Sequence, residues 1–395
     1  MAKVRKWLSF RLVLTILTYS LFSFGRIIHS FSKMASDPSY DFVEEINRLG
    51  LRSFVSGSEG YLQIGPRLIA YIAHWFPVRN QAVVLSFLAT FTFISCALII
   101  NRALTLQTSS AFIGYVSGAI LLLVPAASES TVGNHGSVKW SIVVALCVVL
   151  ICPAFIDKYP NTTIAIAIIS TLCSPLSILA SSYLCYHLIR HRKLSDRKFV
   201  AVFFSICSFT CIQFLYWLFS GKGTHIYGGD IRYSPWPGMG QFWWSLLLTP
   251  PIFVGGSILL VVLAKLLYQK INIEPVIFLA ISTALITISS YITTGIKDST
   301  AIAWQSLSWI LVVLTLHEVT PKLKPKVFGY IAIALTSAFF IRSIEKWYSA
   351  SWYLTDGLKW SYLVDEAKQR CESTNSNTED VQLLLSTVEI NCNDL

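Results

Sequence analysis

The segment 221–245 combines residue types that bind sugars and phosphates. Glycines, prolines and aromatic residues surround its charged side chains, and the candidate substrate-binding residues are Lys222, His225, Asp230, Arg232 and Trp236. Aromatic faces beside acidic groups commonly hold sugar rings, while Lys and Arg side chains bind phosphate or pyrophosphate. An aromatic belt at a membrane surface has a similar composition, because Trp and Tyr gather there. The segment therefore predicts either a site for a phosphorylated sugar or an interfacial loop.

A shorter polar segment, 127–139, holds Glu129, Asn134 and His135 beside two glycines. These side chains are candidates for substrate binding, with His135 orienting an acceptor. A polar turn between two helices has the same composition, so both interpretations stay open.

The segment 26–80 is rich in acids, which are Asp37, Asp41, Glu44, Glu45 and Glu59. Apolar residues at helical spacing over 42–49, followed by Gly50, predict a short helix that ends there. Downstream, the apolar and aromatic stretch 61–76 predicts an amphipathic helix in the membrane interface, with Tyr61 at headgroup depth. Arg67 within it is either a phosphate ligand or a snorkelling interfacial arginine.

The composition requires that these segments be positioned by membrane-spanning helices. Of 395 residues, 54% are hydrophobic and only 13% charged, and the mean hydropathy is +0.59. An ordinary soluble domain has about 25% charged residues. This composition excludes a soluble globular enzyme, a disordered chain and a fibrous protein. In a membrane protein the net charge of +10 does not indicate nucleic-acid binding by itself. Its meaning depends on which side of the membrane the charged residues lie.

Apolar stretches close to the ~20 residues that cross a bilayer recur along the chain. We expect spans at about 8–26, 81–100, 110–127, 139–156, 199–220, 246–268, 274–294, 301–317 and 326–343. The block 162–189 is long for one span and short for two. Pro175 disfavours helix at Ser174, so we expect two short helices that meet there.

The basic residues indicate the orientation. The cluster from Arg190 to Lys198 and the N-terminal residues Lys3, Arg5 and Lys6 are both cytoplasmic only if 162–189 crosses twice. This gives an all-α polytopic protein with about eleven transmembrane helices, an inside N-terminus and an outside C-terminus. The transmembrane domain is 1–343, with 26–80 as its first extracytoplasmic loop, and 344–395 is an extracytoplasmic tail. All but four of the 21 acids then lie outside, the exceptions being Asp157, Asp196, Glu274 and Glu318.

The nine cysteines show no metal-binding spacing, and most fall within expected spans. Cys371 and Cys392 stand in the tail, where an oxidising compartment would allow a disulfide and a mobile tail would keep two free thiols. No nucleotide-binding glycine motif and no metalloprotease or serine hydrolase motif occurs. Nucleotide-driven transport and these hydrolases are therefore disfavoured.

Residues 35–140 resemble bacterial polytopic proteins of the GT-C glycosyltransferase superfamily. The matching residues include Asp37, Phe42 and Gly50, then Glu59–Gly60–Tyr61–Leu62 and Gly65–Pro66–Arg67–Leu68. The loop from Glu129 through Asn134 to Trp140, and the tail after Trp360, are also similar to theirs. Ser36 stands where that family has glutamate, and Pro38 where it has glycine.

The resemblance implies a transferase in the inner (plasma) membrane, with its active site on the extracytoplasmic face. It implies a polyprenyl-phosphate sugar as donor and an essential acid soon after the first span, the place of Asp37 and Asp41. Such a carboxylate would take the proton from an acceptor hydroxyl on a cell-surface glycan or glycolipid. Arg67, Lys222 or Arg232 would stabilise the leaving phosphate. The resemblance implies no particular cofactor, and it leaves open whether a divalent metal is needed. The expected partners are the sugar donor, the acceptor and membrane lipid.

Two alternatives remain at this stage. An O-antigen-type polymerase also has many spans and large outside loops, but would depend on loop arginines more than on a first-loop acid. A flippase or transporter of lipid-linked sugars would be expected to show internal repeats or paired broken helices, and only the break at Pro175 is present.

Overall fold

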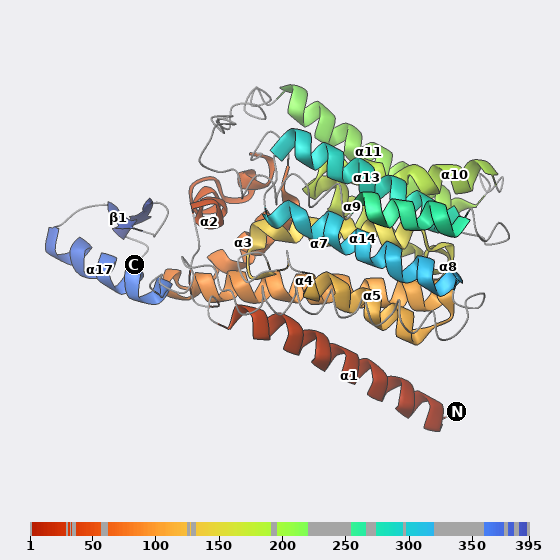
Figure 1. Cartoon of the computed structure of the whole chain (residues 1–395). Coiled ribbons are helices and arrows are strands. Elements are labelled where there is room, and N and C mark those ends of the chain that lie inside the picture. The colour runs from red at the N-terminus through yellow and green to blue at the C-terminus, as the bar shows by residue number, and fades with distance from the viewer. Residues whose placement is uncertain are drawn as a thin grey trace, which may run out of the picture.

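The computed structural model of the chain is a bundle of helices with a small tail at one end (Figure 1). The structure describes residues 2–28, 31, 33, 37–56, 62–124, 127, 132–190, 196–219, 254–265, 274–294, 298–319, 359–374, 378–382 and 387–392. The described part is helical apart from one two-stranded hairpin in the tail, which the sequence did not predict.

The described elements of the first half of the chain are all helical. They are α1 (Ala2–Ile27), α2 (Asp37–Leu49), η1 (Gly50–Val55), α3 (Ile64–His74), α4 (Val78–Thr108), α5 (Ala111–Leu123), η2 (His135–Ser137), α7 (Val138–Leu150), α8 (Pro153–Lys158) and α9 (Pro160–Cys173). The remaining elements are η3 (Pro175–Ser181), α10 (Ser182–Arg190), α11 (Arg197–Phe219), the helix Val254–Lys265, α13 (Glu274–Thr294), α14 (Asp298–Val319), α17 (Trp360–Thr374), β1 (Thr378–Gln382) and β2 (Thr387–Asn391).

Four of the described helices are long and apolar enough to cross a membrane. Their qualifying stretches are Phe10–Ile27, Val78–Thr108, Arg197–Tyr216 and Ala301–Val319. Shorter apolar helices pack beside them, and α7 is almost entirely buried among its neighbours. The expected span 326–343 lies outside the described residues. Together these helices identify a membrane protein.

The expected helix over 139–156 is two helices in the structure. α7 ends at Leu150 and α8 begins at Pro153, with Cys152 between them in a non-helical conformation. The physical reason is Pro153, because a proline disfavours helix at the residue before it and suits the first turn of a new helix.

The predicted break at Pro175 is confirmed. α9 ends at Cys173, Ser174 is extended, and the Ser170 and Ser177 hydroxyls lie 2.8 Å apart across the bend. After the break, α10 leads to the start of α11. The His187 ring near the end of α10 stacks on Phe199 at the start of α11, with centroids 5.1 Å apart.

Hydrogen bonds between distant segments define two opposite ends of the bundle. At one end, Arg26 at the end of α1 donates to the Leu123 and Val124 carbonyls at the end of α5, both at 3.0 Å. At the other, Lys198 at the start of α11 donates to the Asp157 carbonyl of α8 at 2.8 Å. We call the first the α2–α3 end, because these two helices lie there, and the second the α8 end (Figure 1).

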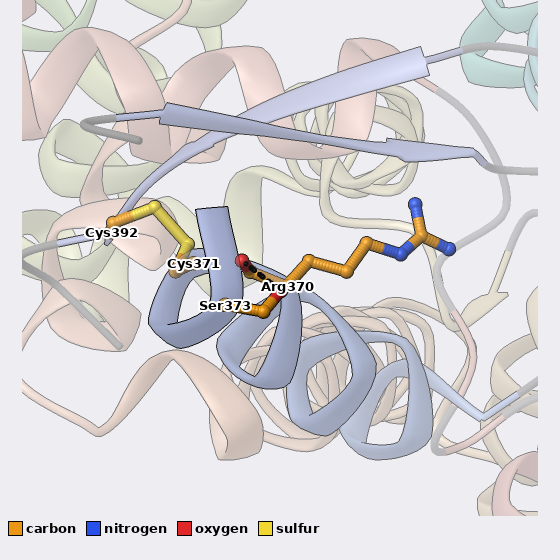
Figure 2. Close-up of a disulfide and its surroundings, with 4 residues drawn as sticks. All are labelled: Arg370, Cys371, Ser373 and Cys392. Atoms are coloured by element: carbon orange, nitrogen blue, oxygen red, sulfur yellow. Dashed lines mark hydrogen bonds between the residues drawn. A yellow bond between two sulfur atoms is a disulfide. The ribbon is translucent and has the colours of Figure 1, made fainter. Parts of the chain in front are cut away.

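The tail docks at the α2–α3 end. The buried Trp360 indole N–H donates to the Val78 carbonyl at 2.7 Å, and β2 contacts α2. Cys371 and Cys392 form a disulfide that joins α17 to the end of the hairpin, as Figure 2 shows. Of the two alternatives for these cysteines, the structure has the disulfide. A unit this small has little core of its own, so the cross-link contributes much of its stability.

Candidate functional site

The acids of the first loop lie along α2. Its buried face carries Phe42, Val43 and Ile46, and Gly50 ends it with a positive φ of 55°, as the helical spacing and the glycine predicted. Asp37 and Asp41 are in its first two turns. Glu45 is four residues further on, so the three acids follow one i, i+4, i+8 row of the helix.

Arg67 joins α3 to α2 by a buried ion pair. Its side chain has 0% exposure, and its Nη1 lies 2.7 Å from Glu45 Oε2, whose side chain is 24% exposed. The same Nη1 also donates to the Ser53 carbonyl. Ser56 Oγ donates to Glu45 Oε2 at 2.9 Å and so supports the carboxylate. A charge buried to this degree requires such partners, so the pair fixes the position of α2 on α3.

The snorkelling interpretation of Arg67 is therefore wrong. Its guanidinium lies inside the protein and 5.1 Å from the centre of the Phe42 ring, where a snorkelling side chain would reach toward water. Its Nε and Nη2 have no hydrogen-bond partner in the described part of the chain. These N–H groups are available donors directly beneath α2.

His135 also contacts the Phe42 ring. Its imidazole meets the Phe42 ring edge-on, with centroids 5.6 Å apart, and it is 1% exposed. Burial lowers the pKa of His135 to about 4, so the ring is neutral near pH 7. Its Nε2 has no hydrogen-bond partner among the described residues. Arg67, Phe42 and His135 thus form a continuous group under α2.

Asn134 forms the turn that holds His135. Its Oδ1 accepts from the Gly136 main-chain N–H at 2.9 Å, which caps the short helix η2. For Asn134, the structure therefore agrees with the interpretation of this segment as a polar turn. His135 instead is buried against Phe42.

A buried glutamine of α11 anchors the chain just before α3. Gln213 Oε1 accepts from the Leu62 N–H at 2.9 Å, and its Nε2 donates to the carbonyls of Leu62, Thr171 and Leu172 at 3.1, 3.0 and 2.8 Å. One side chain therefore ties the first loop to the ends of α9 and α11. Tyr216, one turn further along α11, lies within electrostatic range of Glu45 and Arg67.

The start of α3 is also held against α9 and α7. The Gly65 N–H donates to Cys173 Sγ at 3.1 Å, and a Cβ at Gly65 would lie 2.7 Å from that sulfur, so no larger residue fits without a shift. Lys139 Nζ lies 3.5 Å from Gln63 Oε1. These contacts come from segments more than 70 residues apart and make α3 a rigid platform for α2.

The structure brings together only some of the candidate residues. Arg67 and His135 both contact the Phe42 ring, and Asp37 and Asp41 lie on the helix that carries Phe42. The other candidates are outside the described residues, namely Glu59, Tyr61, Glu129, Lys222, His225, Asp230, Arg232 and Trp236.

Sequence reasoning missed the roles of Glu45 and Gln213. The position of Glu45, four residues after Asp41, was the available signal for a continuing row. Gln213 is a polar residue within an apolar helix, and such residues are expensive in a membrane unless they are paired. Neither signal predicts the partner. Arg67 comes close to Glu45, and Leu62 to Gln213, only in the folded structure.

The helices and this site define a helical membrane protein with a polar, acid-bearing module at one end of its bundle. Among the described residues, no group of three His, Cys, Asp or Glu side chains is placed to hold a metal ion. Comparison of the chain with protein-family models, curated proteins and solved structures gives no match.

Proposed function

We propose that the chain is an integral-membrane glycosyltransferase of the GT-C type that moves a sugar from polyprenyl phosphate to a cell-surface glycan or glycolipid. The observation that carries the proposal is the acidic row of α2, fixed on a rigid platform immediately after the first apolar helix. A general base must be held in a fixed position to act on its substrate. The Arg67–Glu45 ion pair holds α2, and with it the acidic row, against α3.

In this proposal the carboxylate of Asp37 or Asp41 takes the proton of the acceptor hydroxyl as the hydroxyl oxygen attacks the anomeric carbon. The bond from that carbon to the phosphate oxygen breaks, and the lipid phosphate leaves with the electron pair. Cationic side chains of the 221–245 segment, Lys222 and Arg232, stabilise this leaving group. Arg67 is then a positioning residue, because its charge already pairs with Glu45.

Two independent features support an extracytoplasmic position for the α2–α3 end. The tail docked there is closed by a disulfide, which persists in oxidising compartments. The opposite end carries Arg190, Arg197 and Lys198, in line with the preference of basic residues for the cytoplasmic side. We propose on this basis about eleven spans in the plasma membrane, an inside N-terminus and an active site on the outer face.

The test is a transfer assay in proteoliposomes with a radiolabelled polyprenyl-phosphate sugar. The Asp37→Asn/Asp41→Asn variant should lose about 100-fold or more in transfer, the scale of a general base. A matched control, Glu44→Gln, removes an exposed charge from α2 and should retain activity. Full activity of the double Asn variant would exclude the proposed base.

The same assay separates the alternatives. Movement of the labelled lipid across the bilayer without transfer would identify a flippase. Loss of activity on replacing Arg232, with the Asp37→Asn/Asp41→Asn variant still active, would favour a polymerase.

A further inference from the structure

Three cations from three different helices converge on α8 at the end of the bundle opposite to α2. Arg102 belongs to α4, Lys158 to α8 itself and Lys198 to α11. We call these three residues the α8 cation cluster. α8 contacts both α4 and α11, so the cluster is set by the packing of the bundle and not by one flexible segment.

Tyr159, the residue that follows α8, contacts two of the three cations. Arg102 donates to its hydroxyl from Nε at 3.3 Å and from Nη2 at 3.1 Å. The Arg102 guanidinium and the Lys158 ammonium each lie 5.8 Å from the centre of the Tyr159 ring. The ring is itself held by Phe155, at a centroid distance of 5.1 Å. Two cations are thus held beside one fixed aromatic ring.

Among the described residues, the two acids beside the cluster, Asp157 and Asp196, form no ion pair with its cations. Asp196 uses its carboxylate to accept the Lys198 main-chain N–H at 3.1 Å, as a cap of α11. Lys198 Nζ donates to the main-chain carbonyl of Asp157, and the Asp157 carboxylate makes no ion pair in the part of the chain that the structure describes. Arg197 adds a further exposed cation at the same end.

We propose that the α8 cation cluster binds the phosphodiester headgroup of an anionic glycerophospholipid. The cluster lies at the end of apolar helices, where the headgroups of a bilayer would be, and Tyr159 is of the residue type enriched at that depth. Cations gathered between helices at a membrane surface match the negative charge of such lipids. This inference is independent of the proposed transferase activity, because it concerns the opposite end of the bundle.

The test measures binding of phosphatidylglycerol and phosphatidylcholine to the detergent-purified full chain by native mass spectrometry. The unsubstituted protein should prefer phosphatidylglycerol. Each cation near an anionic surface contributes about fivefold, so Arg102→Gln/Lys158→Gln/Lys198→Gln should reduce the preference about 100-fold. If that variant does not fold, Lys158→Gln/Lys198→Gln changes only exposed side chains and should reduce the preference about 25-fold.

Two controls make the result specific. Arg48→Gln/Arg52→Gln/Lys359→Gln removes three exposed cations at the α2–α3 end and should leave the preference unchanged. Arg102→Lys/Lys158→Arg/Lys198→Arg keeps the charge and should keep most of the preference. The proposal is overturned if the Gln variants bind phosphatidylglycerol as the unsubstituted protein does, or if the α2–α3 control loses as much. Equal competition by free glycerol phosphate would also overturn it, since the site would then take a small anion and not a lipid.

Discussion

Breaking the Arg67–Glu45 pair should be more destabilising than breaking any exposed ion pair among the described residues. Glu45→Gln removes the carboxylate charge that pairs with a fully buried guanidinium, and leaves that guanidinium only neutral acceptors among the described residues, the Ser53 carbonyl and the new amide oxygen. Removing one partner of a buried pair costs about 3–5 kcal/mol, and the 24% exposure of Glu45 admits water that offsets part of this. We therefore expect a loss of about 2–3 kcal/mol in the free energy of unfolding.

The assay is thermal unfolding in detergent, followed by intrinsic fluorescence, with Glu45→Gln, Arg67→Met and the double variant forming a cycle. The double variant should be less destabilised than the sum of the single ones, with a coupling of about 1–2 kcal/mol. The matched control is Arg79 with Asp365, a pair at 3.1 Å whose side chains are 61% and 47% exposed. Exposed pairs contribute about 0–1 kcal/mol. A coupling for Glu45 and Arg67 no larger than that of the control would refute the positioning role of this pair.

Three further predictions concern other contacts of the site and tail. Gln213→Leu should lower stability by about 2–3 kcal/mol, because buried main-chain groups at Leu62, Thr171 and Leu172 lose their partner, while exposed Gln107→Leu should have little effect in the same unfolding measurement. Reduction of the Cys371–Cys392 disulfide by a dithiol should increase hydrogen exchange in β2 and α2 but not in α11, and uniform exchange changes would contradict the docking. Because the folded-state pKa of His135 is about 4, below its unfolded value of about 6.5, stability should fall as the pH drops from 6.5 to 4 by up to about 3 kcal/mol. His135→Gln should remove this step from a series of melting temperatures, and an unchanged pH dependence would contradict it.

Local signals in the sequence predicted many of the elements but not their contacts. The break at Pro175 and the end of α2 at Gly50 follow from the backbone preferences of proline and glycine, which act over one or two residues. The same rule applied to Pro153 would have ended the span 139–156 earlier, but the continuous apolar character of that stretch concealed the break.

The candidate site could be predicted in its residue types and only partly in its arrangement. The first-loop acids follow from their clustering, and for Arg67 the sequence leaves a phosphate ligand and a snorkelling arginine as alternatives. Its burial was not predictable, because that depends on Glu45 arriving from α2 and Ser53 from η1. The tail hairpin was likewise missed, since its strands are short and polar and its buried side is completed by α17.

The most direct test of the central claim is a structure of the full chain with polyprenyl phosphate bound in a lipid nanodisc. A catalytic base on α2 requires the lipid phosphate at the α2–α3 end, within about one side-chain length of the first turns of α2 at Asp37 and Asp41. Polyprenyl phosphate bound only at the α8 end, or threaded through the bundle without approaching α2, would contradict a transferase whose base lies on this helix.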